Sequence, residues 1–168
     1  MCRISAENLF LWKKKQLLKG GDTSSLFLLL EILGGIHRDE LNSLQIHSNK
    51  ILNLRKNLES IESIWDKHLV NSNPIQYLCG YTFWRNLKLK VSENVLIPRP
   101  ETEILIDIVL NLFDKSAKKI VFAELGTGSG AISIALSLAK PLWNGIATDI
   151  DEKAIDIASS NFINYSAQ

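Results

Sequence analysis

The sequence predicts an α/β fold in which a small all-α N-terminal domain and a β-hairpin precede the first half of a Rossmann-like domain. Three observations lead to this prediction. Apolar residues recur at helical spacing up to Gly80, apolar and charged residues alternate from Leu87 to Val91, and two short apolar runs after Lys119 are each followed by a helical pattern. The order strand, helix, strand, helix is typical of half of a doubly wound sheet.

Five helices are predicted in the N-terminal half from apolar periodicity and from capping residues such as Ser5, either Asp22 or Thr23, and Asn73. One of them rests on the spacing of Ile51 and Leu54 together with three later apolar residues, which indicates an amphipathic helix. The predicted helices cover residues 5–19, 23–33, 39–44, 49–69 and 74–80.

The C-terminal half is predicted to alternate between strands and helices. We expect a hairpin in which residues 87–91 and 95–97 flank a turn at residues 92–94, and then a helix that begins at Pro100 or Glu101. The apolar run at residues 120–125 predicts a strand that is buried on both faces. A helix at 131–139, a strand at 146–148 and one more helix follow. The predicted regions are a helical domain (1–82), a hairpin linker (83–98) and an α/β domain (99–168).

Composition and charge exclude several classes of protein. The 168 residues carry 19 Lys and Arg against 18 Asp and Glu, so the formal net charge of +1 predicts no direct nucleic acid or membrane partner. The most apolar stretch, residues 26–36, is shorter than the ~20 residues of a membrane-spanning helix. The amino terminus has the wrong charge order for a secretory signal, and the distant Cys2 and Cys79 form neither a disulfide framework nor a metal-ligand pattern. We therefore expect a cytoplasmic protein.

A glycine-rich loop follows the predicted strand at residues 120–125. Gly126, Gly128 and Gly130 alternate with Thr127 and Ser129 at the point where this strand turns into a helix, which is where doubly wound sheets bind ligands. Glycines there let the backbone approach a ligand closely, and the helix amino terminus offers free N–H groups. The loop alone fits either a dinucleotide or another adenosine-containing cofactor.

An acidic residue ends the next predicted strand. Asp149 lies about twenty residues after the loop and can accept hydrogen bonds from ribose hydroxyls, in NAD as well as in S-adenosylmethionine. The alternative is that Asp149 only caps the following helix. From these residues alone, the choice between the two cofactors stays open.

Several strings in the sequence point to one family. Glu-Leu-Gly-Thr-Gly-Ser-Gly-Ala-Ile at residues 124–132 resembles motif I of class I methyltransferases, and Ala-Thr-Asp-Ile-Asp at 147–151 resembles the acidic-strand motif that follows it. More specific is Val-Leu-Ile-Pro-Arg-Pro-Glu-Thr-Glu at residues 95–103, with Gln-Tyr-Leu at 76–78 and Gly80 upstream. This combination is similar to the release-factor glutamine N5-methyltransferases, the HemK/PrmC family, and the likeness covers most of the chain.

The resemblance implies a cofactor, a substrate and a set of site residues. The family transfers a methyl group from S-adenosylmethionine to the side-chain amide of the glutamine in the Gly-Gly-Gln motif of peptide chain release factors. The residues it implies for the cofactor are Gly126, Thr127, Gly128, Ser129, Gly130 and Asp149. Glu124 is expected to orient either the loop or the cofactor's amino group, with a purely structural role as the alternative. The helical domain would contact the release factor, and we expect a monomer.

Five residues are expected near the substrate glutamine by the same resemblance. Arg99, Glu101 and Glu103 would line the entrance, and Phe83 and Trp84 would form part of its wall. Each has a structural alternative, because acidic residues in a first helical turn are favourable in any helix and buried aromatic residues are usually core. His37, His47 and His68 share no spacing, and we expect them to be ordinary surface or capping residues.

The family's Asn-Pro-Pro-Tyr motif, which positions the glutamine amide, does not occur in the sequence. No catalytic residue is therefore assigned, and we expect the 168 residues to be incomplete for catalysis and their sheet to leave an apolar face uncovered. Two other hypotheses remain: an inactive truncated homologue that acts only as a release-factor-binding module, and an NAD-dependent oxidoreductase. The second leaves the string at residues 95–103 unexplained.

Overall fold

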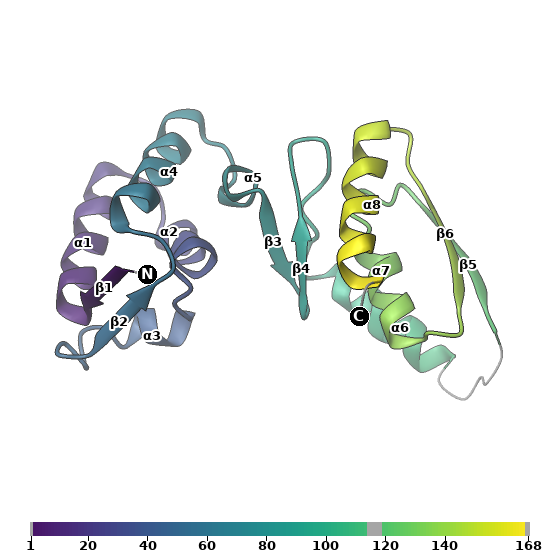
Figure 1. Ribbon diagram of the computed structural model, residues 1–168, viewed down its shortest axis with the longest axis horizontal. Helices are drawn as coiled ribbons and strands as arrows, with labels where there is room; N and C mark the ends of the chain where they lie inside the picture. The colour runs from purple at the N-terminus through teal and green to yellow at the C-terminus, as the bar shows by residue number, and fades with distance from the viewer. Residues whose placement is uncertain (1, 114–118, 167–168) are drawn as a thin grey trace. The chain divides into compact units, whose positions relative to one another are not determined.

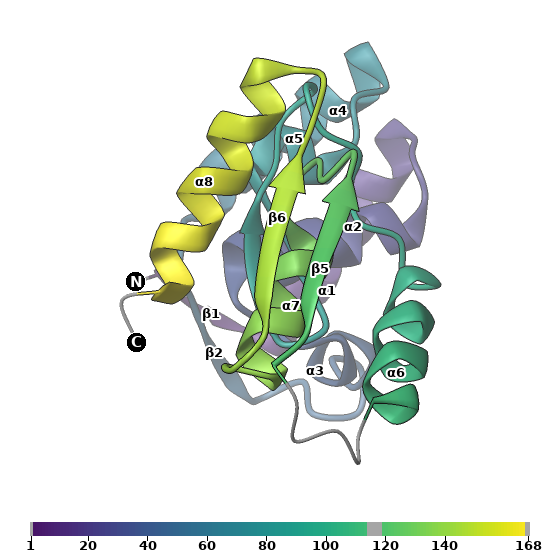
Figure 2. The same cartoon turned by 90° about the vertical axis from the view of Figure 1, so that its right-hand side faces the viewer.

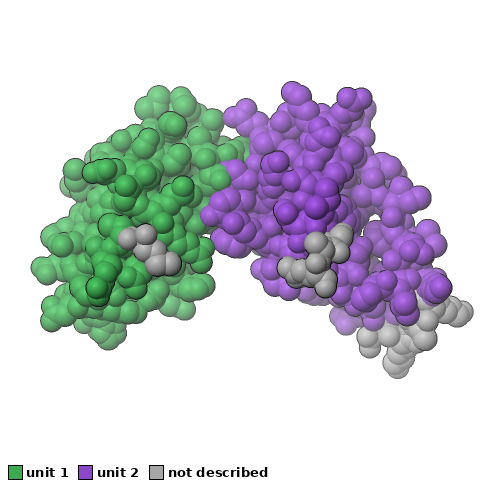
Figure 3. Space-filling view, in the orientation of Figure 1, with its two compact units in different colours: residues 1–79 green, residues 80–168 purple. Residues whose placement is uncertain are grey.

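The computed structural model describes residues 2–113 and 119–166. The chain divides into two compact units, residues 1–79 and residues 80–168 (Figure 3). Each unit contains helices and a two-stranded antiparallel sheet, and the second also contains a parallel pair of strands. The predicted mixed α/β composition is thus confirmed. In the described part of the chain, no helix has both the length and the apolar character that crossing a membrane requires.

The first unit is built mostly from helices with side-chain caps at their amino termini. The side chains of Ser5, Asp22 and Asn57 each accept a hydrogen bond from a backbone amide three residues later, at 3.2, 2.9 and 2.9 Å. Ser5 was predicted as a cap, and Asp22 is one of the two candidates that the sequence offered for the second helix. In chain order the elements are β1 (Cys2–Ser5), α1 (Ala6–Lys19), α2 (Thr23–Leu29), the π-helical turn η1 (Leu30–Gly34), α3 (Arg38–Asn42), β2 (Ile51–Leu54), α4 (Leu58–Asn71) and α5 (Ile75–Cys79) (Figure 1).

Two predictions for this unit are wrong. The N-terminal region is not all-α, because β1 pairs with β2 in an antiparallel ladder. The helix expected at residues 49–69 begins only at Leu58, and Ile51–Leu54 is a strand. Ile51 and Leu54 are three residues apart, which fits a helix, but burial alternates along this segment with Leu52 and Leu54 buried, and that is the period of a strand.

Trp65 is the centre of the first unit's core. Its side chain is fully buried, and its indole nitrogen donates to the backbone carbonyl of Gln16 at 3.3 Å. Gly21, at φ +80°, lies directly against the ring, since a Cβ atom there would come within 2.6 Å of Trp65. The glycine after α1 therefore both provides the left-handed backbone and makes room for the indole.

The second unit starts with a hairpin and continues with alternating helices and strands. In chain order it contains β3 (Tyr81–Trp84), β4 (Leu87–Lys90), α6 (Thr102–Leu112), β5 (Val121–Leu125), α7 (Ala131–Ala139), β6 (Asn144–Thr148) and α8 (Glu152–Ser166). The predicted order of strand, helix, strand, helix is confirmed, with β5 and β6 parallel. The hairpin that was expected to be a separate linker lies within this unit.

The hairpin differs from the predicted one. β4 coincides with the expected first strand, but its partner is β3 on the amino-terminal side, joined by a turn in which Arg85 has φ +51°. The expected second strand at residues 95–97 is not a strand, because the chain turns after β4 with a Val95 N to Ser92 O hydrogen bond of 3.1 Å. Thr82 and Trp84 alternate with more exposed neighbours, so the strand signal was also present before the turn.

The parallel pair is covered on one face only. The expectation that residues 120–125 are buried on both faces is wrong, since Val121 and Leu125 are 72% and 83% exposed and Ile146 on β6 is 63% exposed. Figure 2 shows this face of β5 and β6 turned to the viewer, with α7 behind the sheet. A buried parallel strand needs helices on both sides, and the described residues provide them on one. The expected uncovered apolar face is thus present.

Replacing Trp65 by Ala should destabilise the first unit by about 3–5 kcal/mol, because a large cavity remains and the Gln16 carbonyl loses the indole donor. The measurement is urea unfolding of the 168-residue chain followed by far-UV circular dichroism. Val70→Ala on the same helix is the control, since Val70 is 82% exposed and should change stability by less than about 0.5 kcal/mol. Equal unfolding midpoints for the two variants would contradict this description of the core.

Candidate cofactor site

The glycine loop lies at the carboxyl ends of the parallel strands, between β5 and α7 (Figure 2). The backbone amides of Gly126 and Thr127 both donate to the carbonyl of Thr148, each at 2.9 Å. Gly130 donates to the carbonyl of Thr127 at 2.9 Å, which closes the loop into a turn before the helix. The loop is therefore fixed to the last residue of β6.

Asp149 lies directly beside this loop. One oxygen of its carboxylate accepts from the Gly128 amide at 2.8 Å and the other from the Asp151 amide at 3.1 Å. The Gly128 amide, followed by that of Asp151, holds the pKa of Asp149 below its usual value. The structure thus brings the predicted acidic residue to the loop as an ionised carboxylate.

The three loop glycines have positive φ values for different reasons. Gly126 at +75° and Gly128 at +54° both face open space, where a Cβ atom would meet no atom within 4 Å. Gly130 at +80° faces the interior, where a Cβ atom would lie 3.3 Å from both Ala158 and Phe162. Two glycines therefore leave a bare backbone surface that a ligand can approach, and the third allows α7 and α8 to pack.

Glu124, near the end of β5, holds the loop to the first turn of α7. Its Oε2 atom accepts from the Thr127 hydroxyl at 2.9 Å, from the Ser133 amide at 3.1 Å and from the Ser133 hydroxyl. Thr127 and Ser133 are both buried. This geometry places a carboxylate at a helix amino terminus. It fits the loop-orienting role and the structural alternative equally, so the role of Glu124 stays a prediction.

The residues expected near the substrate make structural contacts in the second unit. The indole of Trp84 donates to the carbonyl of Arg99 at 2.9 Å, which attaches the segment before α6 to the hairpin. Glu103 accepts from the Arg85 amide at 3.2 Å, and the Arg85 guanidinium bonds to the Glu103 carbonyl at 3.1 Å. Glu101 is exposed and provides no side-chain cap to α6.

Phe83 lies on the outer face of the hairpin. Its side chain is 48% exposed and meets Tyr81 edge to face, with ring centroids 5.9 Å apart. An exposed aromatic residue is available to a ligand or partner, in contrast to Trp84, which is buried. The substrate role expected for Phe83 and for the three residues around α6 stays a prediction.

Asn161 was not predicted from the sequence to be a site residue. It is fully buried on α8, and its side chain donates to the carbonyl of Ser129 in the glycine loop at 2.9 Å. The signal was its spacing, because Asn161 falls four residues after the buried Ile157 and three after the buried Ala158. A polar residue in an apolar helical stripe requires a buried hydrogen-bond partner.

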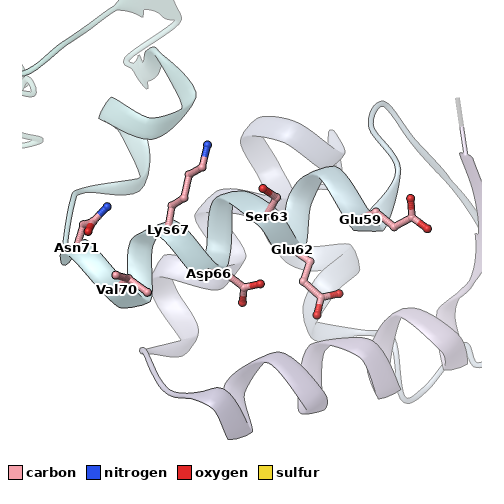
Figure 4. A pocket seen from close by; sticks show the side chains of 7 residues that line it. All are labelled: Glu59, Glu62, Ser63, Asp66, Lys67, Val70 and Asn71. Carbon is pink, nitrogen blue, oxygen red and sulfur yellow. The ribbon is translucent and has the colours of Figure 1, made fainter.

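A cavity of about 560 Å³ lies along α4 in the first unit, remote in sequence from the loop (Figure 4). It is an open trough on one helix face, and two of its carboxylates, Glu62 and Asp66, form ion pairs with Lys19 at 2.6 and 2.8 Å.

Within the described residues, no group of three or more His, Cys, Asp or Glu side chains could hold a metal ion. Burial raises the pKa of Cys79 to about 11, so that thiol is not a nucleophile at neutral pH.

Comparison with known proteins identifies relatives that match most of the chain. No family model matches the chain. It is 44% identical over 94% of its length to the release factor glutamine methyltransferase of Prochlorococcus marinus, covering 54% of that protein. The proteins of the same name from Synechocystis and Gloeobacter violaceus are each 34% identical, over 94% and 86% of this chain and 55% and 48% of theirs.

This chain is a homologue of the release factor glutamine methyltransferases. The resemblance inferred from the sequence strings is thereby confirmed. The chain spans about half the length of the curated relatives it matches.

Substituting two of the loop glycines should separate backbone strain from packing. Gly126→Ala and Gly130→Ala both place an Ala at positive φ, at a cost of about 1–2 kcal/mol. Gly130→Ala also forces a Cβ against Ala158 and Phe162, so it should lower the unfolding midpoint of the second unit clearly more than Gly126→Ala. Thermal and urea unfolding of the two variants measure this, and equal losses would show that Gly130 is not a packing position.

Proposed function

We propose that the second unit is the first half of a Rossmann-like class I methyltransferase domain that binds S-adenosylmethionine at Gly126–Gly130. The observation that carries the proposal is the bare backbone of Gly126 and Gly128, which faces open space beside the Asp149 carboxylate. The residues fit such a cofactor, because a Cβ atom at either glycine would occupy the space that a ligand needs.

The proposed division of roles follows from the geometry of the side chains. Asp149 would accept hydrogen bonds from the ribose hydroxyls through the lone pairs that Gly128 and Asp151 leave available. Glu124 would keep the loop in place through Thr127 and Ser133 rather than contact the ligand. The bound cofactor supplies an electrophilic methyl group on a sulfonium.

We further propose that the whole protein methylates the side-chain amide of the Gly-Gly-Gln glutamine in peptide chain release factors, as the names of its relatives suggest. An amide nitrogen is a weak nucleophile, so alignment and hydrogen-bond acceptors must supply most of the rate. The described residues contribute the cofactor loop, and we place Arg99, Glu101, Glu103 and Phe83 near the substrate. The release factor would bind the first unit, and the protein would act as a cytoplasmic monomer without nucleic acid contacts.

Changing Asp149 to Ala should abolish measurable binding of S-adenosylhomocysteine, the unreactive product form of the cofactor, because the ribose loses its acceptor and Gly128 loses its tether. Calorimetric titration of the 168-residue chain measures the dissociation constant. Asp156→Ala is the matched control, because it removes the same charge from an exposed position on α8.

The outcomes separate the proposed ligand from its rival. Saturable binding by the unsubstituted chain and by Asp156→Ala, with loss in Asp149→Ala, is expected. Unchanged affinity in Asp149→Ala would overturn the role of this carboxylate. Displacement of S-adenosylhomocysteine by NAD at comparable concentration would favour the oxidoreductase hypothesis instead.

A further inference from the structure

Asn161 occupies an unusual place on α8. Its side chain is fully buried, and the neighbouring buried positions of the same helical face are Ala154, Ile157 and Ala158. An amide in such surroundings costs free energy unless all of its polar atoms are paired. Its hydrogen bonds therefore indicate why a polar residue is present there.

The amide of Asn161 connects two segments far apart in the chain. Its Oδ1 accepts from the Lys90 amide at 2.7 Å, and its Nδ2 donates to the Lys90 carbonyl at 3.0 Å, at the end of β4. The same Nδ2 donates to the carbonyl of Ser129 at 2.9 Å. Both Nδ2 hydrogens and the oxygen are thus in use.

Ser129 lies between two residues of the glycine loop that are each held in place by other segments. The residue before it, Gly128, is held from the β6 side by Asp149, and the residue after it, Gly130, packs against Ala158 and Phe162 on α8. The side chain of Asn161 holds the Ser129 carbonyl from the α8 side through a hydrogen bond. The loop is therefore held between a carboxylate on one side and an amide on the other.

We propose that Asn161 is a positioning residue for the cofactor: by fixing the Ser129 peptide, it sets the direction in which the open backbone of Gly126 and Gly128 faces the ligand. This inference rests on the proposed function of the loop. Asn161 also makes the position of the loop depend on β4, because one amide group binds both segments.

The competing explanation is that Asn161 only attaches α8 to the hairpin. Tyr165, one turn further along α8, provides the control for it. Its hydroxyl accepts from the Lys88 amide at 2.5 Å and bonds to the Lys88 carbonyl at 3.2 Å, so it joins the same helix to the same strand with no bond to the loop. Tyr165→Phe removes that connection alone.

The first test needs no ligand. In ¹⁵N-labelled chain, Asn161→Ser should shift the amide resonances of Ser129 and Gly130 and increase hydrogen exchange at Gly128, because a serine cannot reach the Ser129 carbonyl. Tyr165→Phe should leave these loop signals in place and shift those of the hairpin. Unchanged loop signals in Asn161→Ser would overturn the proposal.

The second test measures S-adenosylhomocysteine binding. Asn161→Ser and the isosteric Asn161→Asp should weaken it about tenfold, and Tyr165→Phe less than about twofold, when all are compared at temperatures where they are folded. Equal losses in all three would overturn the positioning role, because attachment to the hairpin would then explain them. If the unsubstituted chain does not bind, the proposed function fails, and the ligand-free loop signals still decide the role of Asn161.

A third measurement uses the unsubstituted chain and is decisive if neither Asn161 variant folds. The side-chain amide protons of Asn161 should move on titration with S-adenosylhomocysteine, because the Ser129 carbonyl that they contact lies in the ligand loop. Static Asn161 signals during a titration that shifts Gly126 and Gly128 would contradict the proposal.

Discussion

The parallel pairing of β5 with β6 is the interaction on which the rest of the candidate site depends. Leu125 pairs with Thr148 at the carboxyl ends of both strands, so the residues that follow each strand start at the same edge. The Thr148 carbonyl then accepts two loop amides, and Asp149 accepts a third. Without that register, the glycines would form an unattached turn and the carboxylate would have no loop to hold.

The parts of the site that could be predicted from sequence are those set by the ends of strands. Gly126, Gly128 and Asp149 follow apolar runs directly, and the geometry of a parallel sheet brings such positions together whatever the rest of the fold is. Asn161 could not be placed in the same way, because its partners Ser129 and Lys90 are 32 and 71 residues away. Tertiary packing alone determines them.

The errors in the fold come from short segments whose apolar spacing fits two periods. Ile51 and Leu54 satisfy helical spacing. They form a strand only because they pair with β1, which lies at the beginning of the first unit's sequence. For the hairpin, strand-like residues stood on both sides of Leu87–Lys90, and the turn at Arg85 and Asn86 selected Tyr81–Trp84. Local sequence indicates that a strand is present but does not identify its partner.

The side chains of α8 have a consequence for how copies of the chain would associate. The backbone amides and carbonyls of Lys88 and Lys90, on the outer edge of β4, are all occupied by Tyr165 and Asn161, so this edge cannot accept another strand. In the part of the chain that the structure describes, β5 and β6 pair only with each other and carry the exposed Val121, Leu125 and Ile146. We therefore expect strand addition at high concentration to favour the parallel pair, with its exposed apolar face, over the outer edge of β4.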